Sequence, residues 1–236
     1  MRFKRAPLLA YLCLLPVLLA LGVWQLNRAE EKCALLTLQK QQETSETLLL
    51  TSTSPDSVNT LLYKPVTATG HYDSDHQILL DNQVYQGKAG YFVLTPFLLA
   101  PDNKAILINR GWVDLGKSRS LLPDVSVPET EITLSGRVNR FPRFGLKLAD
   151  AETTINNWPA VVQTVDTTLL SKQLTYPIFS FQIELNATAP NGFIRHWHQS
   201  IRMTPEKHVG YAVQWFLLAL TLTVLFIKYG IHKNND

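Results

Sequence analysis

Two long runs without a charged residue, one near each end of the chain, limit what this sequence can fold into. Residues 6–26 and residues 209–227 contain no Asp, Glu, Lys or Arg. At 1.5 Å per residue, a helix of about 20 residues spans the roughly 30 Å hydrocarbon core of a bilayer. Both runs are therefore predicted to be transmembrane helices. Pro16 in the first run is tolerable, because neighbouring groups can satisfy the carbonyl that it frees.

The first run has an alternative interpretation as a cleaved signal peptide, because Arg2, Lys4 and Arg5 precede it. However, the run is longer than the roughly 7–15 apolar residues of a signal core. The residues around Ala20 and Gly22 also make a poor cleavage site, because Leu, Val and Trp are interspersed. We expect the run to remain in the protein as an anchor.

Flanking charges predict the orientation. Basic residues in the tails 1–5 and 228–236 favour the cytoplasmic side for both termini. Residues 27–208 then lie on the other side of the membrane. The N-terminus lacks a Ser- and Arg-rich presequence, which favours a bacterial inner membrane and a periplasmic main domain. The two tails are too short for a signalling domain.

The region between the anchors is predicted to begin with a helix and to continue as β structure. Residues 27–50 contain no Gly or Pro and are rich in Glu, Gln, Lys and Leu, which predicts a juxtamembrane helix. Residues 51–59 are typical of a linker. Runs rich in Val, Ile, Thr, Tyr and Phe then predict six strands. These are Lys64–Tyr72, Gln77–Gln83, Gly90–Ala100, Ala105–Val113, Glu131–Arg140 and Ile178–Leu185.

One further helix is predicted over Asp166–Leu174, with Asp166 as its N-cap and with Leu169 and Leu170 packing inward. The predicted fold class is a membrane α+β protein. Two transmembrane helices, one N-terminal and one C-terminal, flank one mostly antiparallel β domain, a sheet or a small barrel.

Composition and motifs exclude several kinds of function. A formal net charge of +3 is too small to indicate nucleic-acid binding. The two cysteines exclude a Cys-rich metal framework, and Cys13 and Cys33 are expected to be unpaired, one inside the span and one outside it. No GxSxG motif, Ser–His–Asp spacing or phosphate-binding loop occurs. The chain is therefore predicted not to be an enzyme.

The second anchor has a clear start signal. Thr204 is a suitable N-cap, Pro205 suits the first helical position, and Glu206 suits the first turn. His208 follows within that first turn, at the outer membrane surface. The positive end of the helix dipole and the apolar surroundings both disfavour the protonated ring. A neutral imidazole is the form that binds a metal or a haem iron.

Two interpretations of His208 remain open at this point. Tyr211 and Trp215 follow it at i+3 and i+7 on the same helix face, and Trp24 lies at the outer end of the first helix. These residues could form an aromatic slot between the helices, with His208 as an axial ligand. Alternatively, they form an interfacial belt that only anchors the helix.

The remaining histidines carry weaker signals. His196 and His198 would share one face of a strand, as a metal-binding pair or as a surface strand that faces lipid headgroups. Two ligands do not make a complete metal site. His71 and His76 lie beside acidic residues in a predicted turn, where solvated polar side chains are usual.

Several motifs occur in the same order as in a known family. They are GVWQLNR (22–28), GHYDSDHQILLDNQ (70–83), GKAGYFVLTPF (87–97), ILINRGWV (106–113) and MTPEKHVGYAVQWF (203–216). On these motifs the chain resembles the Surfeit locus protein 1 family, which consists of membrane-bound assembly factors of cytochrome c oxidase. In the last motif, Thr and Lys stand where the family has Ser and Arg, and both replacements keep the cap and the charge.

The resemblance implies that the protein binds haem a at the membrane and delivers it to the catalytic subunit of cytochrome c oxidase. Other oxidase assembly factors or haem a synthase are implied as further partners. The haem-linked histidine of the family corresponds to His208. Haem a has a farnesyl tail and partitions into lipid, so a carrier needs a slot on the lipid side. Arg28 and Arg202, at the outer helix ends, could provide cations for the propionates.

Two rival functions follow from the same residues. A protein-only scaffold would stabilise an oxidase assembly intermediate without binding haem, and exposed apolar patches on the outer domain would favour it. A membrane haem enzyme is disfavoured, because no acid, base or redox partner is expected near His208.

Overall fold

The computed structural model describes residues 2–3, 5–102, 104–116, 119, 121–142, 155, 157–197 and 203–232. The chain divides into two compact units. One unit comprises Met1–Leu38 and Gln199–Asp236, and the other comprises Gln39–His198. The first unit contains both apolar runs and the second contains the β structure. Arg202 and His198, both named in the sequence-based predictions, lie outside the described residues.

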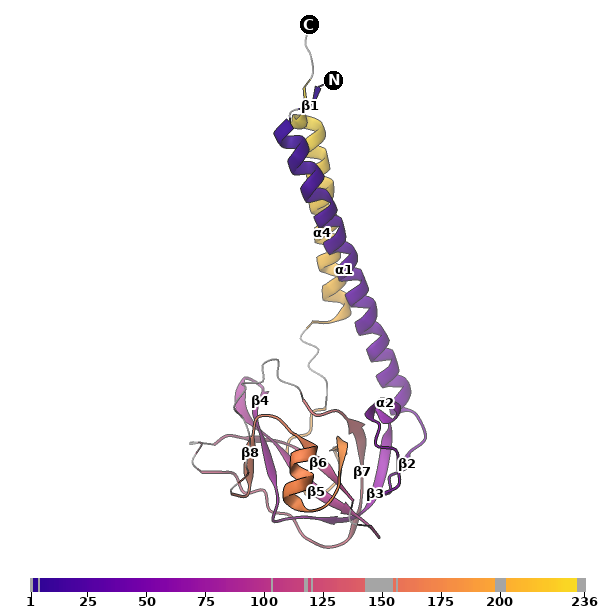
Figure 1. The fold of residues 1–236 in the computed structure, drawn as a ribbon, viewed down its shortest axis with the longest axis vertical. Helices are drawn as coiled ribbons and strands as arrows, with labels where there is room; N and C mark the ends of the chain where they lie inside the picture. Colours follow the sequence, from indigo (N-terminus) through magenta and orange to yellow (C-terminus); the bar gives the residue numbers. More distant parts are fainter. Residues whose placement is uncertain are drawn as a thin grey trace. The chain divides into compact units, whose positions relative to one another are not determined.

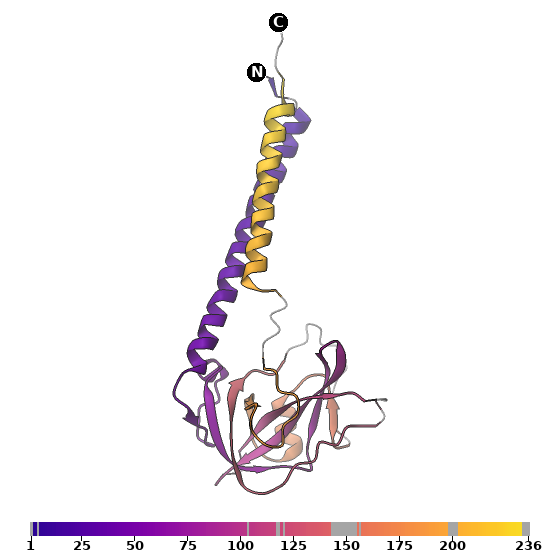
Figure 2. The same cartoon turned by 180° about the vertical axis from the view of Figure 1, so that it is seen from behind.

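The first unit is a pair of antiparallel helices, α1 (Arg5–Glu43) and α4 (Pro205–Leu225), that lie side by side in both views (Figures 1 and 2). At one end, the ring of Tyr11 stacks on that of Phe226, with centroids 4.4 Å apart. Further along α1, the side chain of Phe216 packs against Gly22. Both helices are long and apolar enough to cross a membrane, as judged by length and composition.

A π-helical turn and a short pair of strands form one end of the helix pair. A π-helical turn, η1 (Phe226–Gly230), follows α4 directly. Beyond it, the short strand β10 (Ile231–His232) pairs antiparallel with β1 (Arg2–Phe3). The two chain ends therefore come together at the same end of the helix pair (Figure 1).

The boundaries of the N-terminal helix differ from those predicted. A single helix, α1, continues through residue 26 and ends at Glu43, so the juxtamembrane helix does not extend to residue 50. The hydroxyl of Ser45 donates to the carbonyl of Gln42 at 2.7 Å, which satisfies one of the free carbonyls of the last turn. Leu48 and Leu49 then form strand β2, and Leu50 enters the barrel core, because sheet pairing outweighs helix propensity there.

The second unit is built around a closed five-stranded barrel. Its strands occur in the order β3–β7–β9–β6–β5, and an additional β3–β5 pairing closes the ring. Strands β4 and β8 extend the sheet beyond β5, and β2 adds to β3. The strands are β3 (Pro65–Tyr72), β4 (Ile78–Tyr85), β5 (Lys88–Leu99), β6 (Ala105–Asp114), β7 (Ile132–Asn139), β8 (Ala160–Val162) and β9 (Ile178–Leu185). Two short helices, α2 (Val58–Leu61) and α3 (Thr167–Leu174), complete the unit.

The core lies on both faces of the central strands. Ile106 and Ile108 of β6 point into the barrel, whereas Leu107 between them points to a second cluster under α3. This alternation is the period-two pattern of a strand, and here both faces are apolar because both are covered. Leu170 and Leu174 of α3, the short orange helix in Figure 1, supply the cover on the second face.

All six predicted strands are present, and each boundary agrees within two residues. Helix α3 is also present, and the carboxylate of Asp166 accepts from the backbone N–H groups of Thr168 and Leu169 as its N-cap. The prediction that Leu169 packs inward is wrong: its side chain is 47% exposed, whereas Leu170 is 5% exposed. The sheet is less purely antiparallel than predicted, because three of its eight described pairings are parallel.

Candidate functional site

The start of α4 places His208. The helix begins at Pro205 with Thr204 as its N-cap residue, as predicted, although the Thr204 hydroxyl makes no capping bond. The backbone N–H of His208 instead donates to the Thr204 carbonyl at 3.3 Å. The His208 side chain is consequently held at the first turn of α4, where it is buried against α1.

Across the helix pair, the His208 ring meets Gln25. The distance between Nδ1 of His208 and Oε1 of Gln25 is 2.7 Å, and the two residues are 6% and 8% exposed. An amide oxygen can only accept, so Nδ1 carries the proton. In a neutral ring the lone pair is then on Nε2. Among the described residues, the ring makes no other hydrogen bond. A neutral imidazole with this tautomer is suited to ligate a metal through Nε2.

The three aromatic residues of the predicted slot differ in how far their side chains are buried. Trp215 is half-buried, but Trp24 is 51% and Tyr211 is 43% exposed. The group that contacts His208 between the helices is the amide of Gln25. Arg28 is exposed and pairs with Glu31 on the same helix.

Gln25 is the residue that the sequence interpretation missed. A signal for it was present, because Gln25 is polar and follows 19 residues of α1 without a charged side chain. Polar side chains in apolar spans usually face another helix or mark a functional position. The transmembrane prediction for residues 6–26 includes Gln25 within the apolar run.

A tight approach of the helices accompanies this contact. A Cβ atom added at Gly22 would lie 2.6 Å from Cε1 of Phe216, closer than real contacts allow. Ala29 on α1 and Ala212 on α4 are also buried. Small residues permit such close packing between apolar helices. Gly22 is one turn before Gln25, so the close approach helps to set the register in which Gln25 meets His208.

The barrel contains a buried cation that the sequence analysis also missed. Arg110 of β6 donates to the side-chain oxygen of Gln77 at 2.9 Å, to the carbonyl of Val125 at 2.7 Å and to that of Asn191 at 2.7 Å. Burial lowers the pKa of the Arg110 guanidinium to about 10. Its described partners are neutral oxygens, so Arg110 ties β6 to two loops. This arrangement is structural and offers no open face for a ligand.

An acidic centre joins the β3–β4 turn to the end of α3. The carboxylate of Asp73 contacts Nδ1 of His76 at 2.7 Å and accepts from the hydroxyl of Tyr176 at 2.6 Å. Burial, and then the bond to Asp73, raise the pKa of the Tyr176 phenol. His71 is exposed. The turn is therefore more ordered than the sequence predicted, and His76 has a defined partner.

A second ion-pair network lies where the chain enters and leaves the barrel. Arg137 of β7 bonds Glu184 through Nε at 2.6 Å and Glu43 at the end of α1 at 2.6 Å. Arg137 also donates to the backbone carbonyl of Trp197. Burial raises the pKa of Glu184, and Arg137 opposes that shift. One side chain of β7 thus contacts both the beginning and the end of the barrel unit.

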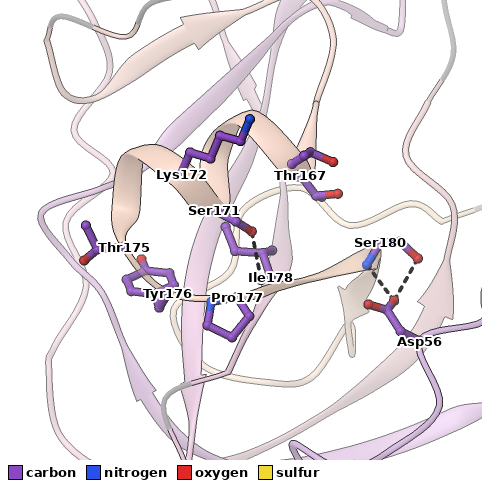
Figure 3. Close-up of a pocket in the computed structure, with 10 residues that line it drawn as sticks. Asp56, Thr167, Ser171, Lys172, Thr175, Tyr176, Pro177, Ile178 and Ser180 are labelled. Atoms are coloured by element: carbon purple, nitrogen blue, oxygen red, sulfur yellow. Dashed lines mark hydrogen bonds between the residues drawn. The ribbon is translucent and has the colours of Figure 1, made fainter.

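A surface groove of about 640 Å³ runs beside α3 (Figure 3). Six of its ten lining residues carry a hydroxyl group, and the lining also includes Lys172 of α3 and Asp56. The Asp56 carboxylate accepts from the backbone N–H and the hydroxyl of Ser180, both at 2.8 Å. Because this carboxylate is already engaged, the groove offers no convergent set of groups for chemistry.

Potential metal ligands are scattered in the described part of the chain. No three His, Cys, Asp or Glu side chains gather there to hold an ion. His196 stacks on the ring of Tyr85 with centroids 5.4 Å apart, and its predicted partner His198 is not described. Cys13 and Cys33 are both free.

The chain thus combines a closed β-barrel domain with two long apolar helices. These helices share a buried histidine–amide pair. The chain belongs to the SURF1 family, whose model matches residues 12–220. This match includes α1 from its first turns, the whole barrel and most of α4.

Several named proteins are similar to the chain. A SURF1-like protein of Rickettsia felis is 27% identical over 223 residues, covering 90% of this chain and 92% of that protein. The Surfeit locus protein 1 of Gallus gallus is 27% identical over 233 residues, covering 90% and 72%. The cytochrome oxidase assembly protein SHY1 of Saccharomyces cerevisiae is 32% identical over 116 residues, covering 47% of this chain and 30% of the yeast protein.

Proposed function

We propose that this protein is an assembly factor for cytochrome c oxidase that binds haem a through His208 and delivers it to the catalytic subunit. Membership of the SURF1 family and the similarity to a yeast protein named for cytochrome oxidase assembly support the assembly role. The observation that supports the haem role is the buried His208 ring, whose Nδ1–H is held by Gln25.

The residues around His208 fit an axial ligand for a haem iron. Bound haem a would supply an iron centre with an open coordination position for Nε2. The chain itself would supply a neutral, oriented imidazole and an apolar helix surface on which Trp215 and Tyr211 lie nearby. Because His208 is only 6% exposed, binding requires the helices or neighbouring side chains to move apart at this turn.

Cations near the outer helix ends would pair with the haem propionates. Arg28 is exposed but already paired with Glu31, so a propionate would compete with that carboxylate. Arg202 is proposed for the same role from its place in the sequence. A transfer protein must also release its cargo, and a single histidine ligand favours moderate affinity.

Two apolar helices and the bacterial SURF1-like relatives support a location in the bacterial inner membrane. We propose cytoplasmic termini and a periplasmic barrel, because the basic residues lie in the tails. In this setting, the protein would bind lipid through its exposed helix faces. It would meet the oxidase subunit, and other assembly factors or haem a synthase, without catalysing a reaction itself.

The test is an optical spectrum of the protein purified in mild detergent from cells that make haem a. We expect a haem a band in the parent and its loss in His208→Ala. His71→Ala is the matched control, because His71 is an exposed barrel residue, and that variant should keep the band. A parent that restores oxidase assembly without any haem band would disprove the haem role.

A protein-only scaffold is the second candidate. Exposed apolar side chains on the barrel unit favour it, notably Leu121 at 79% and Val84 at 71% exposure. Under this function, Val84→Asp or Leu121→Asp would reduce co-purification of the oxidase subunit, whereas His208→Ala would have no effect.

A further inference from the structure

Gln25 and His208 form an isolated polar contact in an apolar setting. Among the described residues of α1 and α4, these two are the polar side chains that are buried. A buried amide and a buried imidazole each cost free energy unless they are hydrogen-bonded. Their mutual bond of 2.7 Å removes that cost for one atom of each side chain. The pair therefore stabilises a single arrangement of the two helices at this turn.

The bond also selects one chemical form of the histidine. A neutral imidazole carries its proton on either Nδ1 or Nε2, and the two tautomers differ in which nitrogen presents a lone pair. With Oε1 of Gln25 facing Nδ1 at 2.7 Å, the bond forms when Nδ1 carries the proton, because an amide oxygen only accepts. A low local dielectric strengthens this preference, because water does not compete for the bond.

We propose that Gln25 is the positioning residue for His208. It holds the ring in the Nδ1–H tautomer, so the lone pair of the neutral ring lies on Nε2, the atom that would ligate the iron once neighbouring side chains move aside. The part of this inference that concerns haem rests on the proposed function. Groups that accept the second ring N–H of a ligating histidine fix the ring orientation and raise its basicity. Gly22 assists, because it permits the close approach of Phe216 that sets the register.

A purely structural role is the alternative, in which the pair only joins two helices. Hydrogen bonds between membrane helices do serve this purpose. The two roles differ in what they change. A structural tie affects helix association, whereas a positioning residue also changes the ring tautomer and the strength of the iron–histidine bond.

The first arm of the test needs no haem. Full-length protein with ¹⁵N-labelled histidine in lipid nanodiscs reports the tautomer of His208 by the nitrogen chemical shifts. We expect protonated Nδ1 and unprotonated Nε2 in the parent. Gln25→Met keeps the volume but removes the acceptor, and should give a mixture of tautomers. A parent ring protonated on Nε2 would overturn the inference.

The second arm uses haem a added to the same proteins. Loss of an outer hydrogen-bond partner typically weakens metal affinity about 10- to 100-fold, and we expect that loss in Gln25→Met. The iron–histidine stretching frequency of the ferrous protein should fall in Gln25→Met and rise in Gln25→Glu, whose carboxylate is a stronger acceptor. Gln214→Met is the matched control, because Gln214 is exposed on α4, and it should match the parent.

The outcomes separate the inference from the proposed function. If the parent binds no haem a but shows the Nδ1–H tautomer that Gln25→Met loses, the haem function fails and the pairing stands. If the parent binds haem a through His208 and Gln25→Met leaves both affinity and frequency unchanged, Gln25 is not a positioning residue. Helix content measured by circular dichroism excludes loss of folding in either variant.

Discussion

The bonds of Arg110 illustrate how one side chain can organise a small barrel. Its guanidinium donates to an oxygen in the turn before β4 and to carbonyls in two loops that are far from each other in the sequence. Only a planar group with several fixed donors can satisfy acceptors in different directions at once. Buried carbonyls left without a donor cost about 1–3 kcal/mol each.

We therefore expect Arg110→Lys to lower stability by roughly 2–4 kcal/mol, because a single ammonium cannot reach all of these oxygens. The measurement is the thermal midpoint of the full chain in detergent, followed by tryptophan fluorescence. Arg119→Lys is the control. Arg119 has a half-exposed side chain paired with Asp81, so Arg119→Lys should leave the thermal midpoint nearly unchanged. Equal midpoints for the two variants would contradict the structural role of Arg110.

At the residue scale, sequence reasoning identified His208 but not the group that orients it. The helix-start pattern from Thr204 to Glu206 locates the histidine with local information alone. Gln25 could not be paired with it in the same way, because the two residues are 183 positions apart. Arg110 was missed for a related reason: its partners come from separate loops that only the closed barrel brings together.

Among the secondary structure elements, α3 shows which contacts of a short helix matter for stability. Leu170 packs with Leu80 and Leu107 beneath the helix, whereas the adjacent Leu169 points outward. A helix of eight residues is marginal by itself, so its formation depends on that packing.

Leu170→Ala is expected to destabilise the barrel by about 2–4 kcal/mol, the usual cost of truncating a buried leucine. Leu169→Ala removes the same atoms from an exposed position and should cost no more than about 1 kcal/mol. Urea unfolding of both variants, with unchanged m-values, would measure the difference. If the two variants unfold at the same urea concentration, the assigned inner face of α3 is wrong.

Elements with long repeating patterns were predictable, and short elements were not. The six main strands each have eight or more residues of β-type sequence between turn signals. Strands β2 and β8 have two and three residues, too few for a pattern. Both join the sheet by parallel pairing, β2 with the next strand along the chain, β3, and β8 with β4. For β8, the partner β4 precedes it by some 75 residues of chain.

For the whole molecule, the two native cysteines provide a test of membrane orientation. Cys33 follows the apolar run and Cys13 lies inside it, and both are free. With a membrane-impermeant maleimide on intact spheroplasts, Cys13→Ser protein should be modified at Cys33. Cys33→Ser protein should react only after detergent is added. Modification of Cys33 only in opened membranes would reverse the proposed orientation.

The pairing of Gln25 with His208 also has a consequence for biosynthesis. Gln25 lies in α1, which is translated before the barrel, and His208 lies in α4, which is translated after it. The amide of Gln25 cannot bond to His208 until all the strands of the barrel and then α4 have been translated. A nascent chain interrupted between β9 and α4 has every strand of its barrel but no oriented imidazole. The haem-binding capacity proposed for this protein would thus arise only after α4 has been translated.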